Sequence, residues 1–348
     1  MADDVLRDRT SGALLAAACA DALGVPYEPA QRGPADGRPR MLGGGHGNYE
    51  PGEYSDDTQM AVVIAQVAAD GVDLRSEPAL DRIAAGFVVD WYGGGATDVG
   101  AQTRALLGAA APEFRLDGGA ALLRRLGADL HRRTGRSAGN GSLMRTAPVA
   151  LAYAGDPDAM VEAARAVSGL THYDPIAGDA CALWCLAIDH AIHTGELDAT
   201  VGLARVASTS VGRETSAGRE ASASAGREAS GEYWAARLAE AEAKSPEAFA
   251  PVSGWVVGAM QGAWSAIVQV RDVEDPAERL RAGVESAVNG GGDTDTVAAI
   301  AGALLGAACG ASAVPTEWRA LVHGWPKLDA DGLVDLALRC ANRRSGVD

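Results

Sequence analysis

Two short acidic motifs carry the side chains best suited to chemistry in this chain. The first, SDDT at 55–58, follows a Gly- and Pro-rich stretch and precedes a predicted helix that starts near Gln59. The second, DTDT at 293–296, follows NGGG at 289–292 and precedes an Ala- and Gly-rich predicted helix over 297–309. A single acid at a helix start is commonly a cap that accepts backbone N–H groups. Finding the same arrangement twice instead favours a shared acidic site.

Such a site needs a counter-charge. The carboxylates of Asp56, Asp57, Asp293 and Asp295 would repel one another strongly if they were buried together. Carboxylates and hydroxyls form an all-oxygen set that suits a hard divalent cation, which indicates Mg²⁺ or Mn²⁺; Ca²⁺ is also compatible, although there is no EF-hand loop. The lack of His and Cys in either motif argues against zinc. Asp57 and Asp293 are 236 positions apart (293 − 57 = 236), so only the fold can bring the motifs together.

The glycines before Asp293 suggest a ligand for the same site. Without Cβ atoms, the N–H groups of Gly291 and Gly292 can approach an anion closely at a helix start. Beside two cations, the expected anion is a diphosphate. The alternative is a plain flexible loop, because a run of three glycines is a weak signal.

The elements that must position these motifs are helices. Met60, Val63, Ile64 and Val67 follow the spacing i, i+3, i+4, i+7, and similar apolar stripes recur along the chain. Three Asp-Pro pairs, at 156–157, 174–175 and 275–276, each place a capping carboxylate before a proline at the first helical position. No run of alternating strands is found. We therefore predict an all-α fold, a compact multi-helix bundle that brings the two acidic motifs together at a central metal site.

Composition limits the classes of function. The 348 residues are 47% hydrophobic and 22% charged, enough for a substantial core, so disorder of the whole chain is excluded. The formal charge of −16 excludes an extended basic face for a nucleic-acid backbone or an anionic membrane. The five cysteines include no C-x-x-C pair, which argues against a disulfide framework or a zinc site. The N-terminus lacks a signal-peptide pattern, and we expect a cytoplasmic monomer that does not bind membranes.

The chain is predicted to form a single domain over 1–348 with two irregular segments. Residues 208–231 contain three Gly-Arg-Glu repeats in a Ser/Ala background and no large apolar side chain apart from one valine. This composition predicts a disordered low-complexity insertion. Residues 343–348 are predicted to be a frayed tail.

Further motifs, taken with the two acidic ones, carry a resemblance to a known family. In chain order they are SGA at 11–13, ADALG at 20–24 with Glu28, SDDT at 55–58, GNGSLMR at 139–145, Thr171-His172, and GGDTDT at 291–296. With these motifs in this order, the sequence resembles the ADP-ribosylglycohydrolase family, which includes ADP-ribosylarginine hydrolases and the dinitrogenase reductase-activating glycohydrolase. The resemblance implies an all-helical enzyme with two Mg²⁺ or Mn²⁺ ions that removes ADP-ribose from a modified protein or small molecule.

The resemblance also assigns roles to residues. Glu28 matches a family glutamate on a mobile flap near the metals. For the mechanism we expect Asp57 and Glu28 to handle protons, while Asp56 and Asp295 arrange metal and ribose. The loop 137–145 is the implied ribose and diphosphate loop, in which Arg145 either contacts the ligand or supports the loop. The implied metal ligands are Ser55, Asp56, Asp57, Asp293, Asp295 and Thr296. The implied substrate-binding residues are Asp98, Ser137, Gly139, Asn140, Gly141, Ser142, His172, Gly291 and Gly292.

Asp98 is the residue that indicates which linkage of ADP-ribose is cleaved. It resembles an acid that meets the guanidinium group in arginine-directed members, and a carboxylate can bind that planar cation through paired hydrogen bonds. The alternative is that Asp98 caps a helix over 99–107. We expect cleavage of the glycosidic bond at C1″ of arginine-linked ADP-ribose. Serine- or ester-linked ADP-ribose, an inactive ADP-ribose-binding protein, and a metal-dependent phosphohydrolase stay open as alternatives.

Overall fold

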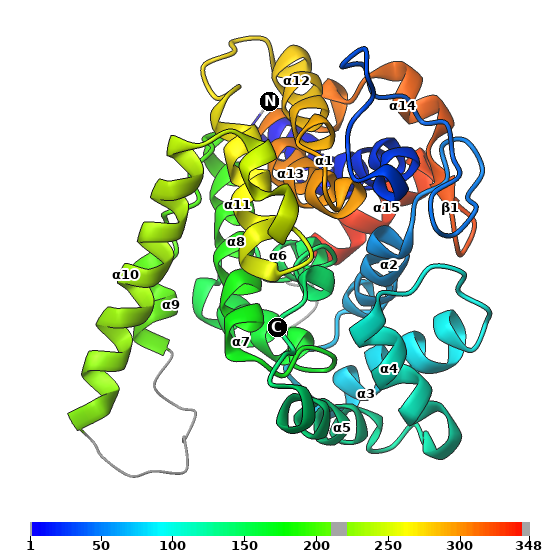
Figure 1. Cartoon of the computed structure of the whole chain (residues 1–348), viewed down its shortest axis with the longest axis vertical. Helices are drawn as coiled ribbons and strands as arrows, with labels where there is room; N and C mark the ends of the chain where they lie inside the picture. The colour runs from blue at the N-terminus through cyan, green and yellow to red at the C-terminus, as the bar shows by residue number, and fades with distance from the viewer. Residues whose placement is uncertain (1, 210–220, 343–348) are drawn as a thin grey trace.

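A computed structural model describes residues 2–209 and 221–342. Within these ranges nearly all regular structure is helical (Figure 1), and the strands are β1 (His323–Gly324) and β2 (Leu328–Asp329), a short antiparallel pair. The predicted all-α class is confirmed. The α-helices are α1 Ala2–Gly24, α2 Asp56–Ala69, α3 Glu77–Ala85, α4 Ala101–Ala110, α5 Gly119–Thr134, α6 Ala147–Ala152, α7 Pro157–Ser168, α8 Pro175–Thr194, α9 Leu203–Thr209, α10 Ala221–Ala243, α11 Val256–Val268, α12 Pro276–Asn289, α13 Thr294–Cys309, α14 Thr316–Leu321 and α15 Ala330–Ala341.

The helix pair α1 and α13 forms the centre of the bundle. The two helices lie antiparallel, because residues near the start of α1 contact the end of α13 and Gly24 contacts its start. A Cβ atom on Gly12 would overlap the carbonyl oxygen of Gly306, and one on Gly302 would lie 2.6 Å from the carbonyl oxygen of Ala16. Small residues thus allow the backbones to pack closely. As a result, the last turn of α1 lies against the first turn of α13.

Helix α8 contacts both helices of this pair. It packs against α7, α13, α6 and α11. Among the described residues, it is the one helix whose length and composition would allow it to cross a membrane, but 72% of its apolar window is buried inside the bundle. This burial is typical of a core helix in a compact bundle.

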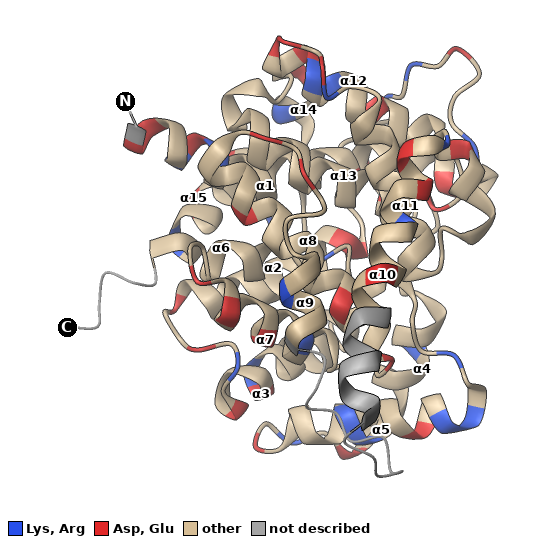
Figure 2. Cartoon of the chain, turned by 90° about the vertical axis from the view of Figure 1, so that its left-hand side faces the viewer, with Lys and Arg blue, Asp and Glu red and all other residues tan. Residues whose placement is uncertain are grey.

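The remaining helices cover the central group. In Figure 1, α3, α4 and α5 lie together below α2, while α9 and α10 form an outer pair beside α8 and α11. Figure 2 shows Asp and Glu positions on many helices, with Lys and Arg positions scattered among them.

Local signals set the helix boundaries. The side chains of Asp156, Asp174 and Asp275 each accept a hydrogen bond from a backbone N–H in the first turn of α7, α8 and α12. The three predicted Asp-Pro helix starts are therefore confirmed. Helix α2 starts at Asp56 and α13 at Thr294, so both acidic motifs lie within the first turns.

Two sequence-based predictions concern segments that lie partly or wholly outside the described residues. In the segment 208–231, residues 210–220 lie outside the described residues, and the backbone from Ala221 onward belongs to α10. The predicted tail at 343–348 also lies outside them.

Candidate metal centre and ligand cavity

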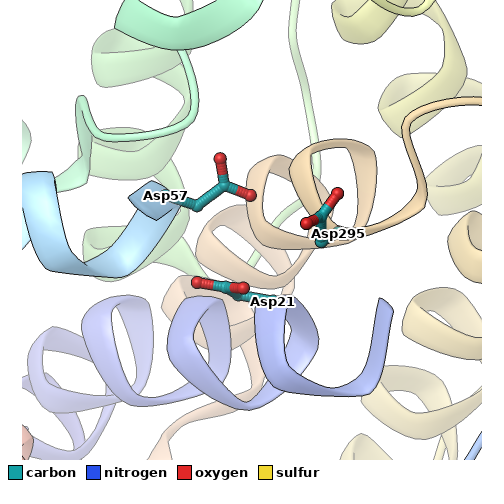
Figure 3. A group of neighbouring side chains, drawn as sticks. All are labelled: Asp21, Asp57 and Asp295. Carbon is teal, nitrogen blue, oxygen red and sulfur yellow. The ribbon is translucent and has the colours of Figure 1, made fainter. Parts of the chain in front are cut away.

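The acidic motifs meet where three helices converge. Figure 3 shows Asp21 from α1, Asp57 from α2 and Asp295 from α13 with their carboxylates gathered together. One oxygen from each of these residues lies within 4.8 Å of the other two. Glu28 and Asp293 form a second group with Asp295 under the same limit. The fold thus joins the two motifs that the sequence places 236 positions apart (293 − 57 = 236).

Asp21 holds the first motif in place. Its Oδ1 accepts the backbone N–H of Ser55 at 3.0 Å, and its Oδ2 accepts the backbone N–H and the hydroxyl of Thr58 at 3.0 and 2.6 Å. Asp21 therefore satisfies N–H groups at the start of α2 that would otherwise lack partners. Burial raises its pKa to about 6. Sequence reasoning did not select Asp21, although an acid within an Ala-rich helix was a usable signal.

Asp57 has one satisfied oxygen and one that lacks a partner. Its Oδ1 accepts the hydroxyl of Thr296 at 3.0 Å, whereas the buried Oδ2 has no hydrogen-bond partner among the described residues. The Ser55 hydroxyl oxygen accepts the Asp57 backbone N–H at 3.3 Å, so Ser55 is the N-cap of α2. A buried carboxylate oxygen without a partner is costly unless a cation binds it.

The electrostatics of the centre are strongly unfavourable for so many negative charges. Burial, reinforced by neighbouring carboxylates, raises the pKa values of Asp56, Asp57 and Asp295 well above the ordinary value of 3.8. Glu28, on the 3-10 turn Val25–Ala30 that follows α1, has a pKa raised to about 8 by burial and by the charges of Asp293, Asp98 and Asp21. Simultaneous ionisation of all these carboxyl groups is therefore unfavourable.

The donor set fits divalent cations. Among the described residues, no Lys or Arg forms an ion pair with Asp21, Asp56, Asp57, Asp293 or Asp295. The imidazole Nε2 of His46 lies 3.8 Å from Oε1 of Glu28. Carboxylate oxygens, the Thr296 hydroxyl and the unpartnered Asp57 Oδ2 form a hard oxygen donor set.

A cavity of about 860 Å³ opens beside this centre. Its walls include twelve of the predicted site residues: Glu28, Asp56, Asp57, Asp98, Ser137, Gly139, Asn140, Gly141, His172, Asp293, Asp295 and Thr296. Its volume is typical of a pocket for a small molecule of drug-like or nucleotide size. The predicted metal and ligand residues therefore line one continuous space.

The loop 137–141 forms one wall and is held from two sides. Gln102 of α4 donates to the carbonyl oxygens of Ser137 at 3.2 Å and Thr171 at 2.9 Å, and its Oε1 accepts the Gly139 N–H at 3.3 Å. Asn140 Nδ2 donates to Asp293 Oδ2 at 2.6 Å and to the carbonyl oxygen of Ser253 at 2.9 Å. The loop is thus fixed relative to the acidic centre. Gln102 belongs to no recognisable motif, and sequence reasoning missed it.

Three predicted ligand contacts lie away from this cavity. The N–H groups of Gly291 and Gly292 donate to the carbonyl oxygens of Val288 and Gln31, so they are not available to an anion. These glycines have φ values of 77° and 75°, and they serve the turn that precedes α13. The buried Ser142 hydroxyl accepts from Ser168 at 2.9 Å on the core side of the loop.

Asp98 faces the cavity and does not cap a helix. Helix α4 starts at Ala101, and its N-cap is Gly100, which has no side-chain cap. The capping alternative is therefore wrong. Burial, with the charge of Asp293 as a further cause, raises the pKa of Asp98.

Two other features complete the walls. Trp255, which sequence reasoning did not select, is 41% exposed and lines the cavity beside Gly139, with which it forms a β-bridge. His172 lies beneath the loop, and its Nδ1 is 2.7 Å from the Thr171 hydroxyl. The Arg145 guanidinium donates to that hydroxyl from the core at 2.7 Å, so Arg145 supports the site without lining the cavity.

Comparison with known proteins agrees with this geometry. The profile of a family described as ADP-ribosylglycohydrolase matches residues 2–347, almost the whole chain. The chain belongs to the ADP-ribosylglycohydrolase family. The names of the family and of its listed relatives are those of enzymes, and this chain is accordingly an ADP-ribosylglycohydrolase.

Relatives within the family have related activities. The chain is 27% identical over 321 residues to the ADP-ribosylarginine hydrolase Tri1 of Pseudomonas putida, covering 89% of this chain and 73% of that protein. It is 26% identical over 332 residues to the ADP-ribosyl-[dinitrogen reductase] glycohydrolase of Rhodospirillum rubrum, covering 90% of each. A solved ADP-ribosylglycohydrolase-related protein complex aligns with a TM-score of 0.65 and 26% identity, covering 98% of this chain and 99% of that one.

Proposed function

We propose that this ADP-ribosylglycohydrolase hydrolyses the N-glycosidic bond between C1″ of ADP-ribose and the guanidino group of a modified arginine. The observation that carries the proposal is the position of Asp98. Its carboxylate lines the same cavity as the acidic centre and has no helix to cap. A positively charged guanidinium binds favourably to carboxylates that line a cavity.

Two Mg²⁺ or Mn²⁺ ions are the proposed counter-charge of the acidic centre. Asp56, Asp57, Asp293, Asp295 and the Thr296 hydroxyl would hold them, and the unpartnered Oδ2 of Asp57 supports this assignment. When bound, such ions supply Lewis acidity and lower the pKa of water. The Ser55 hydroxyl oxygen already accepts an N–H group within the chain, so Ser55 is the predicted ligand with the least support.

The chain's own residues would perform orientation and proton transfer. Asp56 and Asp295 line the cavity, where they can position the hydroxyl groups of a ribose. Asp57 and Glu28 are the candidates for moving protons, because positive charge builds on the sugar as the bond breaks and the guanidine must leave in a neutral form. The raised pKa of Glu28, about 8, is compatible with a carboxylic acid that keeps its proton near neutral pH.

The rest of the cavity supports an ADP-ribosyl ligand. Asn140 and the hydrogen-bonded loop 137–141 offer polar groups on one wall. The exposed indole of Trp255 offers a flat apolar face at the rim, suited to stacking with a purine base. The modified partner would be an ADP-ribosylated protein or small molecule.

A substrate panel tests the proposal. Arginine-, serine- and ester-linked ADP-ribose are incubated with the enzyme, with and without Mg²⁺, and release of ADP-ribose is measured. We expect Mg²⁺-dependent release from the arginine-linked substrate. Faster release from the serine or ester linkage would overturn the arginine assignment, and binding without any release would favour an ADP-ribose-binding protein.

A matched pair of variants tests the role of Asp98. Asp98→Asn keeps the shape of the side chain and removes the charge, and it should lower kcat/KM for the arginine linkage by about tenfold to a hundredfold, the loss typical of a charge-assisted hydrogen bond. The control Asp81→Asn alters a carboxylate that caps α5 by accepting the backbone N–H of Ala120 at 2.8 Å. Equal losses for the arginine and ester linkages in Asp98→Asn would contradict the assignment.

A further inference from the structure

The most unusual buried group outside the acidic centre is the guanidinium of Arg145. Arg145 is fully buried, and among the described residues it forms no ion pair with a carboxylate. It donates to Met60 Sδ at 3.4 Å and Thr171 Oγ1 at 2.7 Å, and it lies 4.5 Å from the centre of the Phe87 ring. Because a buried charge with so few partners is costly, its presence here indicates a specific task.

Arg145 is connected to the cavity through one hydroxyl group. The Oγ1 atom of Thr171, which accepts from Arg145, lies 2.7 Å from Nδ1 of His172. Thr171 is itself buried, and among the described residues its hydroxyl has no other hydrogen-bond partner. The three side chains therefore form a linear chain from the core to the cavity wall.

Donor and acceptor chemistry fixes the direction of this chain. A guanidinium can only donate, so the Thr171 oxygen accepts from Arg145 and its single proton is available to donate. The acceptor within reach is Nδ1 of His172. An imidazole that accepts at Nδ1 and is neutral carries its proton on Nε2. The opposite arrangement would leave the buried Thr171 proton without an acceptor.

The other ring nitrogen reaches the ligand space. His172 lines the cavity, and no described residue forms a hydrogen bond with Nε2. Cβ atoms built on Gly139 and Gly141 would each lie 3.4 Å from Nε2, so the nitrogen sits between these two glycines of the loop. Glycine at both positions keeps side chains away from the N–H group.

We propose that Arg145 and Thr171 are positioning residues that hold His172 as the neutral Nε2–H tautomer, so that it presents a fixed hydrogen-bond donor to an oxygen atom of the ligand. This inference rests on the proposed function, because it assumes that the ligand occupies this cavity. The nearby positive charge also opposes protonation: burial and Arg145 lower the pKa of His172 to about 3. The ring therefore donates from one nitrogen only.

The tautomer can be measured in the unaltered protein without any substrate. Long-range proton–nitrogen correlation spectra of ¹⁵N-labelled protein distinguish protonated from unprotonated ring nitrogens for each of the six histidines. The His172 signals are identified by their absence from His172→Asn. At pH 7 we expect a protonated Nε2 and an unprotonated Nδ1. A protonated Nδ1, or a mixture of tautomers, would overturn the inference whatever the enzyme's substrate.

Two threonine variants test the role of the hydroxyl. Thr171→Val keeps the shape and removes the hydroxyl; it should mix the His172 tautomers and raise KM about tenfold with little change in kcat, since one ligand hydrogen bond is weakened in both ground and transition states. Thr171→Ser retains the hydroxyl and should behave like the original enzyme. Thr146→Val, which removes a buried hydroxyl directed at Cys185, controls for the cost of the substitution itself. An unchanged tautomer and KM in Thr171→Val would refute the proposal.

Discussion

Removing divalent cations should make the protein less stable as the pH rises, and Glu28 allows the size of this effect to be worked out. Its pKa is about 8 in the folded chain against an ordinary value of 4.5. Between these values the folded state holds a proton that the unfolded state has released. The free energy of unfolding therefore falls with increasing pH across this window.

The magnitude follows from the two pKa values. At about 1.36 kcal/mol per pH unit, the interval from 4.5 to about 8 sets an upper limit of about 5 kcal/mol for the loss caused by Glu28. The Glu28 side chain is 23% exposed, so solvent screening reduces this value. Between pH 6 and 8 we expect a loss of about 1–3 kcal/mol from this residue. Asp56, Asp57 and Asp295, whose pKa values are also raised, act in the same direction.

The assay is urea unfolding at several pH values between 6 and 8, with a chelator and again with Mg²⁺. Mg²⁺ at about 100 times its Kd should add about 2.7 kcal/mol, because it binds only the folded protein. The increase should be larger at pH 8 than at pH 6, where protons compete for the carboxylates.

Two variants separate the contribution of Glu28 to the pH dependence of stability from the contributions of other residues. Glu28→Gln should flatten the pH dependence of the chelated protein and raise its stability at pH 8. Glu247→Gln, at an exposed position outside the cavity, should change neither. If the chelated original protein were equally stable at pH 6 and 8, or if Mg²⁺ had no effect on its unfolding, the acidic centre would not be a cation site of the kind described.

Two further predictions concern catalysis. Asp57→Asn should weaken Mg²⁺ binding measured by calorimetry and lower kcat by at least about a hundredfold, because the variant removes a charge from the proposed cation site; normal Mg²⁺ affinity would contradict this. Trp255→Ala should raise KM by about tenfold with kcat unchanged, the loss expected for one stacking contact of about 1–3 kcal/mol, and steady-state kinetics would show it. An unchanged KM would exclude stacking at the rim.

The sequence was informative where one local signal decides the structure. The apolar spacing of Met60, Val63, Ile64 and Val67 predicts a buried helix face, and all four side chains are buried. The Asp-Pro pairs predict helix starts because a capping carboxylate and a missing N–H act within a single turn. The acidic motifs were found because residues with the same chemistry are adjacent in the chain.

Site residues that come singly from separate elements could not be predicted from the sequence in this way. Gln102 and Trp255 line the cavity, but neither belongs to a motif, and only the packing of α4 and of the turn before α11 brings them to the loop 137–141. The sequence also does not show that the N–H groups of Gly291 and Gly292 have hydrogen-bond partners within the chain. Their N–H groups are committed to carbonyl oxygens of Val288 and of a residue far away in the sequence, Gln31.

The hydrogen bonds of Asp21 explain how the start of α2 keeps its structure beside several acidic side chains. Its carboxylate accepts two N–H groups and one hydroxyl at the start of α2, so part of the negative charge there is stabilised by hydrogen bonds even without a cation. The close contact between Gly24 and the backbone of Asp295 fixes the other side of the centre through main-chain packing. In the described part of the chain, the buried Oδ2 of Asp57 in the same centre has no hydrogen-bond partner. The scaffold therefore holds the unsatisfied oxygen in place, and a cation that binds it does not first have to order the chain.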